Sequence, residues 1–315
     1  MDKKLITVIG ATGAQGGGLA RAILADRGGE FAVRAVTRKP NGDAARALAR
    51  AGAEVVEADL DDIASLRRAF DGAYGAYCVT NYWELLSPDR ELAQAKHLAD
   101  ATQASSVSHI VWSTLEDTRE RVPLDDPRMP TLLERYKVPH LDTKGESDKH
   151  FDASRTTWFR TSFYWDNLIH LGMGPKPDES GQLAFVLPMG DKKLPGIAAE
   201  DIGRCALGVF RRGPSAIGKY IGVAGEHLTG AEMARALSRA LERPVVHRDP
   251  PASVYRSLGF PGADDLGNMF QYTAEFEEEY CAERSVAESR RLNPELMTFA
   301  AWLSKNVSRI PLSPK

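Results

Sequence analysis

The first 115 residues alternate between short apolar runs and longer segments in which apolar positions recur at helical spacing. Five apolar runs have the length and composition of buried strands: residues 5–10, 31–38, 53–59, 73–80 and 107–114. Segments with helical periodicity lie between them: residues 16–26, 42–52, 62–70 and 88–105. Short strands that alternate with amphipathic helices form right-handed βαβ units. The pattern therefore predicts an α/β fold with a doubly wound parallel sheet, to which residues 156–162 add a sixth strand.

The second half of the chain has a looser pattern. Residues 115–135 carry three prolines and many charges, which predicts a surface loop, and a helix is expected from about Leu141 to Phe151. Further helices are predicted near residues 200–211 and over 229–243, the latter with Thr229 as its N-cap. Strands are expected at residues 218–225 and 244–249. We therefore expect residues 161–315 to form a smaller, mainly helical C-terminal lobe that is interleaved with the sheet.

The composition excludes several classes of protein. The net charge is −3 and the isoelectric point is near 6.2, so a basic face for direct nucleic-acid binding is not expected. The apolar run after the first lysines is too short for a signal peptide, and no run reaches the length of a membrane span. Cys78, Cys205 and Cys281 are far apart and lack metal-ligand spacing. We expect a cytoplasmic protein with reduced thiols, no metal site and no membrane contact.

A glycine-rich turn ends the first predicted strand. Gly10, Gly13 and Gly16 give the spacing G-x-x-G-x-x-G between a strand and a helix. Such glycines allow a tight turn, a close approach of the backbone to a pyrophosphate, and close packing of a helix whose N-terminus faces the negative charge. The turn therefore predicts a Rossmann-like dinucleotide-binding domain over residues 1–160. Six turn residues are assigned to the cofactor: Gly10, Thr12, Gly13, Ala14, Gln15 and Gly16.

The end of the second predicted strand selects between two cofactors. Chains that select NAD usually place an acidic residue there to hold the ribose 2′-hydroxyl. This chain has Thr37, Arg38 and Lys39 instead. A guanidinium pairs with a 2′-phosphate through two hydrogen bonds, whereas a carboxylate repels it. The sequence favours NADP(H) over NAD(H), with Arg38 and Lys39 as phosphate contacts; the alternative is that Arg38 is an exposed loop residue.

Two later strand ends supply further candidates for the cofactor site. Four residues are assigned to the adenine, ribose and nicotinamide: Asp59, Leu60, Thr80 and Asn81. One carboxylate near Asp61 can instead cap the helix that follows. Tyr82 and Trp83 come directly after Asn81. They are either apolar walls of the site or part of the core.

Several longer stretches resemble the NmrA-like family, an atypical branch of the short-chain dehydrogenase/reductases. They include GATGAQGGG, VTRKP, EVVEADLDD, GAYGAYCVTNYWE, HLDTKGE and LGFPGADDLGNMF, and the resemblance runs from about residue 4 to residue 305. The nearest likeness is to the redox-sensor members of the family. The resemblance implies a Rossmann-like NADP-binding domain, a small C-terminal lobe, and an oligomeric state or protein partner that follows NADPH levels. It also implies that Lys144 hydrogen-bonds the nicotinamide ribose and that Tyr164 and Asn167 pass beside the nicotinamide.

The sequence departs from the family pattern near the 2′-phosphate. Some sensor members carry additional lysines after the arginine and in the helix after the fourth strand. This chain has Asn41, Gly42 and Ala93 at these places. Lys39 and Lys96 are the residues available to compensate.

The catalytic position of the superfamily is altered as well. Hydride-transferring members place a tyrosine one helical turn before the lysine, and its phenol protonates the substrate. Here His140 occupies the tyrosine position and Lys144 follows at i+4. Three roles stand open for His140: a replacement acid, a residue that orients the cofactor, or polar lining without a role.

Other polar residues near this position have weaker claims. Ser113 or Thr114 lies where reductases place a substrate-orienting hydroxyl, and the alternative is a hydroxyl that bonds to the backbone. Tyr136 reaches the site only if the intervening chain bends, which we do not expect. Asp142 and Asp166 are interpreted as solvated surface carboxylates.

Two functions fit these observations. The first is an NADP(H)-binding regulator that senses the NADPH/NADP+ ratio and reports it through a homodimer or a protein partner. The second is an NADPH-dependent reductase of a small-molecule substrate with a carbonyl or unsaturated group. A complete cofactor turn beside a proton-donor position that lacks its usual phenol favours the first. An apolar pocket with one hydrogen-bond donor beside the nicotinamide would favour the second.

Overall fold

A parallel sheet of seven strands forms the larger part of the molecule. The computed structural model describes residues 3–84 and 86–312. The strand order of this sheet is β11-β6-β5-β4-β1-β2-β3, and all neighbouring strands are parallel. The strands are β1 (Lys4–Val8), β2 (Phe31–Thr37), β3 (Glu54–Glu57), β4 (Gly75–Cys78), β5 (His109–Thr114), β6 (Thr156–Arg160) and β11 (Tyr220–Gly222). The predicted doubly wound α/β sheet is confirmed, and β11, from the second half of the chain, forms its edge.

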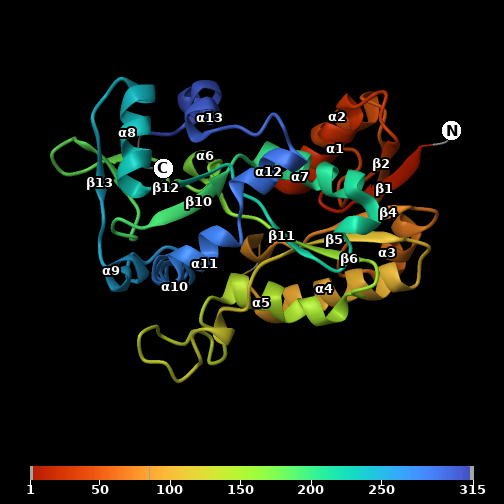
Figure 1. Ribbon diagram of the computed structural model, residues 1–315, viewed down its shortest axis with the longest axis horizontal. Helices are drawn as coiled ribbons and strands as arrows, with labels where there is room; N and C mark the ends of the chain where they lie inside the picture. The colour runs from red at the N-terminus through yellow and green to blue at the C-terminus, as the bar shows by residue number, and fades with distance from the viewer. Residues whose placement is uncertain (1–2, 85, 313–315) are drawn as a thin grey trace.

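Helices cover both faces of this sheet (Figure 1). One face carries α1 (Ala14–Ala25), α2 (Asp43–Arg50), α7 (Ala199–Arg212) and α12 (Val286–Leu292), and the other carries α3 (Ile63–Phe70), α4 (Pro88–Gln103) and α5 (Pro139–Ser147). Each face buries its own apolar cluster. Because both faces are covered, the central strands β4 and β5 are buried along their whole length, which explains their largely apolar sequences.

The C-terminal lobe combines helices with two small sheets. One sheet contains β7 (Phe163–Tyr164), β10 (Lys193–Ile197) and β12 (Glu226–Thr229), and the other contains β8 (Lys176–Pro177), β9 (Leu183–Val186) and β13 (Val245–Arg248). The helices of the lobe are α6 (Asn167–His170), α8 (Gly230–Leu241), α9 (Ala252–Arg256), α10 (Ala263–Glu275), α11 (Glu277–Ala282) and α13 (Phe299–Asn306). Thr229 caps α8 in a capping box with Glu232, as the sequence predicts. A separate apolar cluster holds this lobe together.

The segment between β5 and α5 is not the simple surface loop that its prolines suggest. Val122 and Met129 are buried, and Lys137 is fully buried with its ammonium donating to the carbonyls of Asp126 and Met129 at 3.0 and 2.6 Å. The prediction of a surface loop over residues 115–135 is therefore wrong for Val122 and Met129. Helix α5 begins at Pro139, two residues before the predicted start, because proline fits the first turn of a helix.

A half-buried carboxylate follows the end of α5. Asp148 Oδ1 accepts hydrogen bonds from Trp112 Nε1 at 2.8 Å and Thr114 Oγ1 at 2.6 Å, and Oδ2 accepts one from the Tyr220 hydroxyl at 3.0 Å. Burial raises the pKa of Asp148 from its ordinary value of 3.8 to about 6. The folded chain therefore holds this proton more tightly than the unfolded chain does.

The substitution Asp148→Asn tests this effect on stability. In the wild type, the folded state keeps the Asp148 proton up to a higher pH than the unfolded state does. The contribution of Asp148 to the free energy of unfolding therefore falls as pH rises from about 4 to about 6. Asparagine keeps the shape, accepts the Trp112 and Thr114 bonds and donates to Tyr220. We expect the melting temperature of the variant, relative to wild type, to rise across this pH window when followed by circular dichroism.

The exposed neighbour Asp152 provides a control of opposite sign. The hydrogen bond from the Ser154 hydroxyl lowers the pKa of Asp152, so this carboxylate contributes stability that is lost as pH falls. The melting temperature of Asp152→Asn relative to wild type should therefore fall as pH rises. A pH-independent difference for Asp148→Asn would contradict the interpretation of that residue.

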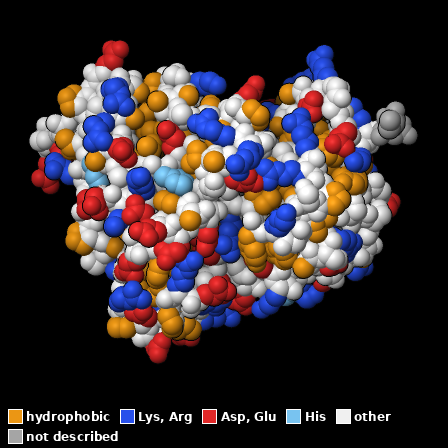
Figure 2. Space-filling view, viewed as in Figure 1, with side chains coloured by type: hydrophobic (Ala, Val, Ile, Leu, Met, Phe, Trp, Pro, Cys, Tyr) orange, Lys and Arg blue, Asp and Glu red, His pale blue; other side chains and the backbone are white. Residues whose placement is uncertain are grey.

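The surface matches the mixed charge of the composition. On the face shown in Figure 2, basic and acidic side chains are interspersed. Among the described residues, no helix combines the length and the hydropathy that a bilayer span requires. Cys78 and Cys205 are buried and Cys281 is half-buried, and all three are free thiols.

Candidate functional site

A cleft of about 1220 Å³ opens at the carboxyl ends of the central strands, between the sheet and the C-terminal lobe. This is the edge at which doubly wound sheets bind ligands. All the residues assigned to the cofactor line it, as do three of the candidates for catalysis: Gly10, Thr12, Gly13, Ala14, Gln15, Gly16, Arg38, Lys39, Asp59, Leu60, Thr80, Asn81, Tyr164 and Asn167, with Ser113, His140 and Lys144. Tyr82 and Trp83 also line the cleft, which supports their interpretation as walls. The structure thus brings together residues that are up to 157 positions apart in sequence (10 to 167).

The glycine turn has the geometry that a pyrophosphate needs. Gly10 has a φ of 63°, which lets the chain leave β1 in a tight turn. A Cβ on Gly16 would lie 2.5 Å from the Ile9 carbonyl oxygen and 2.6 Å from that of Gly10. The first turn of α1 contains no acidic residue, so its N-terminal amides face the cleft without a competing carboxylate. These features fit a dinucleotide phosphate.

Gln15 connects this turn to the middle of the cleft. Its Oε1 accepts a hydrogen bond from the Ser113 hydroxyl at 2.8 Å and another from the Tyr77 hydroxyl, and its Nε2 donates to the Tyr164 hydroxyl. Burial raises the pKa of both tyrosines, so both phenols are neutral donors or acceptors. The Ser113 hydroxyl therefore bonds to a side chain of the cofactor turn rather than to the backbone.

The adenosine end of the cleft is charged. Arg38 Nη1 lies 2.7 Å from Glu84 Oε1, and the two side chains are 54% and 42% exposed. Asp59 Oδ1 accepts from the backbone amide of Asp61, and the cap of α3 is Asp62. Asp59 therefore remains at the cleft while its neighbour caps the helix. Lys96 pairs with Asp100 and is not among the described residues that line the cleft, so Lys39 is the additional lysine that the structure places there.

Lys144 is fixed by a buried polar network. Its ammonium lies 2.8 Å from Thr80 Oγ1 and 3.2 Å from Glu91 Oε1. Glu91 is 3% exposed, and its second oxygen accepts from the Thr143 hydroxyl at 2.7 Å. The carboxylate thus holds both the lysine and the helix that carries it. An ammonium fixed in this way at the cleft wall is suited to hydrogen-bonding ribose hydroxyls.

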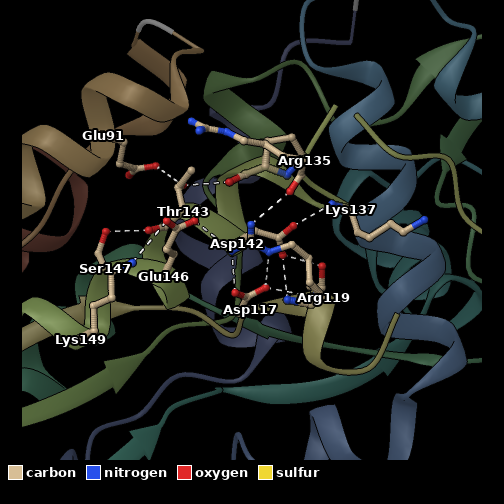
Figure 3. Close-up of polar contacts among 12 residues, drawn as sticks. Glu91, Asp117, Arg119, Arg135, Lys137, Asp142, Thr143, Glu146, Ser147 and Lys149 are labelled. Atoms are coloured by element: carbon tan, nitrogen blue, oxygen red, sulfur yellow. Dashed lines mark hydrogen bonds and ion pairs between the residues drawn. The ribbon is translucent and has the colours of Figure 1, made fainter. Parts of the chain in front are cut away.

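A second carboxylate anchors the start of α5 (Figure 3). Asp142 Oδ2 accepts from the amides of Lys137 and Val138 at 2.8 and 3.0 Å, and Oδ1 accepts from the Thr118 amide and hydroxyl at 2.8 and 2.6 Å. Asp142 is fully buried, so its interpretation as a surface carboxylate is wrong. Burial nevertheless raises its pKa to about 6 against these four donors. The anchored helix places the i and i+4 residues His140 and Lys144 on the cleft side.

His140 is paired with an aspartate from the C-terminal lobe. Its Nδ1 lies 2.5 Å from Asp265 Oδ1, and its backbone amide donates to Oδ2 at 3.2 Å. Both side chains are buried, and the imidazole packs on Trp83 with ring centroids 4.7 Å apart. Within the described chain, Nε2 has no hydrogen-bond partner among the protein groups, and His140 lines the cleft. This arrangement fixes the ring and leaves one nitrogen to act on a ligand.

Three other candidates do not reach the cleft. Thr114 donates to Asp148, and Tyr136 is buried outside the set of described residues that line the cleft. The expectation that Tyr136 is remote is therefore confirmed. Asp166 is half-buried, and its Oδ2 accepts from the Ala199 amide at 2.9 Å at the start of α7. It contributes to the packing of the lobe on the sheet, which corrects its interpretation as a freely solvated group.

The C-terminal lobe supplies an apolar end to the cleft. The residues are Leu171, Met173, Val186, Leu194, Tyr255, Leu258, Phe260, Leu266 and Met269. Leu171, Leu258 and Phe260 are 56%, 52% and 39% exposed, so the rim as well as the wall is apolar. Among the described lining residues, Lys176 is the one charged residue that the lobe contributes. An uncharged apolar ligand fits this end.

Comparison with protein families places the chain. A model described as the NmrA-like family matches residues 2–303. The chain belongs to the NmrA-like family. The NmrA-like family domain-containing oxidoreductase FrzB of Cladobotryum sp is 32% identical over 222 residues, which cover 65% of this chain and 64% of FrzB. The oxidoreductase lnbB of Aspergillus flavus is 27% identical over 290 residues, which cover 86% of this chain and 83% of lnbB.

Solved structures share the NmrA-like fold. NmrA, described as a negative transcriptional regulator and solved in complex with NADP, superimposes with a TM-score of 0.74 at 22% identity. The match covers 97% of this chain and 95% of the NmrA chain. NmrA has also been solved in complex with NAD. The match confirms the predicted fold over almost the whole length of the chain.

Three site residues of this NmrA-like chain escape the sequence analysis: Glu84, Glu91 and Asp265. Each is an acidic residue far along the chain from the residue with which it pairs. Asp265 lies in the quoted stretch LGFPGADDLGNMF, at the start of a helix in which charged residues are otherwise expected as solvated caps. The resemblance of that stretch to the family points to its importance. The resemblance does not identify His140 as the partner of the Asp265 carboxylate.

Proposed function

We propose that the chain is an NADPH-dependent reductase of uncharged, apolar compounds that carry a carbonyl or another polarised double bond. The observation that carries the proposal is the buried His140–Asp265 pair, which faces the same cleft as Lys144 and the apolar lining of the C-terminal lobe. Polar groups that converge in an apolar pocket are typical of an active site. The oxidoreductase names of FrzB and lnbB support the same class of reaction.

The residues of the cleft fit NADP(H). The glycine turn and the N-terminus of α1 would hold the pyrophosphate, and Arg38 and Lys39 would meet the 2′-phosphate. Lys144, held by Glu91 and Thr80, would donate to the nicotinamide ribose. The complexes of the family member NmrA with NADP and NAD support this choice of ligand class.

The protein groups supply the proton side of the reaction. When bound, NADPH would provide the hydride for the carbon of the double bond. The imidazolium of His140 donates its Nε2 proton to the oxygen that becomes an alcohol, and Asp265 accepts the Nδ1–H bond throughout and stabilises the charged ring. The ion pair with Glu91 holds the Lys144 ammonium in position at the same cleft. The apolar lobe excludes water, which strengthens these polar interactions.

A redox sensor is the second candidate function. The observation that favours it is the imidazole of His140 at the position where hydride-transferring relatives of the superfamily use a phenol. Sensing requires that NADPH and NADP+ differ in affinity for two protein states, and a tenfold difference corresponds to about 1.4 kcal/mol. A homodimer or a protein partner would then report the cofactor form.

Two measurements on the same sample separate these functions. NADPH oxidation is followed with a panel of uncharged ketones, aldehydes, quinones and enones, together with carboxylated analogues. The proposal expects oxidation that depends on an uncharged substrate and falls at least about tenfold with the charged analogue. NADPH binding without turnover across the panel, together with an oligomeric state that differs between NADPH and NADP+ by size-exclusion chromatography, would contradict the reductase and support the sensor.

A further inference from the structure

The arginine expected at the 2′-phosphate already has a partner in the protein. Arg38 follows β2, and Glu84 ends the short helical turn Tyr82–Glu84 that follows β4. The guanidinium and the carboxylate are 2.7 Å apart, and hydrogen bonding to Glu84 raises the pKa of Arg38. Because β1 lies between β4 and β2 in the sheet, this ion pair crosses the edge of the cleft above the glycine turn.

The other charges at this end are already balanced or lie further away. Asp61 is paired with Arg90 and accepts a hydrogen bond from Gln94 at 3.0 Å. Asp59 and Asp61 raise the pKa of Arg38 only through longer-range charge interactions, which are weaker than the effect of Glu84. Glu84 therefore is the carboxylate that competes directly for the guanidinium.

A 2′-phosphate and Glu84 compete for the Arg38 guanidinium. The phosphate carries a charge of roughly −2 and needs the guanidinium edge for bidentate binding. With Glu84 on Nη1, the phosphate either displaces the carboxylate or sits beside it and is repelled. A ribose 2′-hydroxyl is neutral and donates readily to a carboxylate. Glu84 thus opposes the phosphate but is compatible with the hydroxyl.

We propose that Glu84 sets the cofactor specificity of this chain by competing with the 2′-phosphate for Arg38. NAD-selective Rossmann folds place an acidic residue at the end of the second strand. In this chain Arg38 follows the second strand, and an acidic group reaches the same place from the helical turn after the fourth strand. The preference for NADP(H) that Arg38 alone would give is thereby reduced. The inference rests on the proposed cofactor binding and does not depend on reduction.

The test compares affinities for NADPH and NADH by isothermal titration calorimetry. The full-length wild type, Glu84→Gln, Arg38→Ala and the double variant are titrated with both nucleotides. Glutamine keeps the length of the side chain and removes its charge. We expect Glu84→Gln to raise the ratio of NADPH to NADH affinity by roughly five- to tenfold, in line with a half-exposed ion pair that opposes a ligand of high charge. In the Arg38→Ala background, the same change should alter the ratio by less than about twofold.

Asp43→Asn is the matched control. Asp43 lines the same cleft at the start of α2, so this variant removes one negative charge from the same wall without removing the Arg38 partner. It should shift the ratio by less than about twofold. Because Glu84 is 42% exposed, its substitution should leave the melting temperature nearly unchanged, which separates specificity from folding.

The outcomes separate this inference from the proposed function. An unchanged or lower affinity ratio in Glu84→Gln overturns the inference, and so does an equal rise of the ratio in the Arg38→Ala background. If the wild type binds neither nucleotide, the proposed function and this inference both fail. If the wild type binds NADPH but Glu84→Gln leaves the ratio unchanged, only the inference fails.

Discussion

A His140→Ala variant is expected to bind NADPH within about threefold of the wild-type affinity and to lose turnover by roughly 10²–10⁴-fold. The imidazole has no part in the glycine turn or the Arg38 site, so cofactor binding should survive its removal. His140 lines the cleft and its Nδ1 is engaged by Asp265, so in the proposed mechanism Nε2 is the proton donor. Calorimetry measures the affinity, and NADPH oxidation with the best substrate of the panel measures turnover.

Chemical rescue sharpens this prediction. Added imidazole should restore part of the activity of His140→Ala, because the vacated space lies between Asp265 and the cleft. Asp265→Asn should lower kcat with little change in KM, since Asp265 acts on the ring and not on the substrate. His170→Ala removes an exposed histidine of the C-terminal lobe and should behave like wild type. Equal losses of NADPH affinity and turnover in His140→Ala would point to a structural role instead.

A Gly16→Val variant is expected to lose NADPH affinity by at least about a hundredfold. Even the Cβ would lie 2.5 Å from the Ile9 carbonyl oxygen and 2.6 Å from that of Gly10, and both are backbone atoms that cannot move aside without moving the turn. The phosphate amides and the first turn of α1 would then be displaced together. A loss of this size corresponds to about 2.7 kcal/mol of binding free energy, which is plausible for a disrupted anion site.

Gly28→Ala is the matched control for this second prediction. A Cβ on Gly28 meets no atom within 4 Å, so this variant should bind NADPH like wild type. Melting temperatures of both proteins without nucleotide distinguish a local change at the turn from loss of the fold. Retained NADPH affinity in Gly16→Val would contradict the placement of the pyrophosphate at this turn.

The strands of the main sheet and their parallel arrangement could be predicted because the sheet is covered on both faces. β4 and β5 are buried along their whole length, and their largely apolar runs are visible in the sequence. The place of β11 could not be predicted, since its three residues form an edge strand with an exposed tyrosine and pair with β6, more than sixty positions earlier. The buried parts of the segment before α5 were missed for a related reason: their burial comes from tertiary packing and not from a periodic pattern.

The cofactor end of the site could be predicted because it depends on local backbone geometry. Gly10 and Gly16 are identified by their spacing, and Arg38 by its place at the end of a strand. The proton-transfer end depends on contacts between distant segments, such as the 125 positions that separate His140 from Asp265. Asp142 shows the same limit, because a fully buried carboxylate with four donors has the same sequence signature as a solvated one.

The central claim is that the cleft transfers hydride from NADPH to an uncharged substrate with His140 as the proton donor. The most direct test uses NADPH with deuterium at both C4 positions of the nicotinamide and determines the mass of the alcohol that wild type and His140→Ala form from a ketone or an aldehyde. The account predicts one deuterium in the wild-type product for each NADPH oxidised, and a product of the same mass formed at a rate roughly 10²–10⁴-fold lower by the variant. If the wild type binds NADPH and no product of the panel carries deuterium, the account is contradicted.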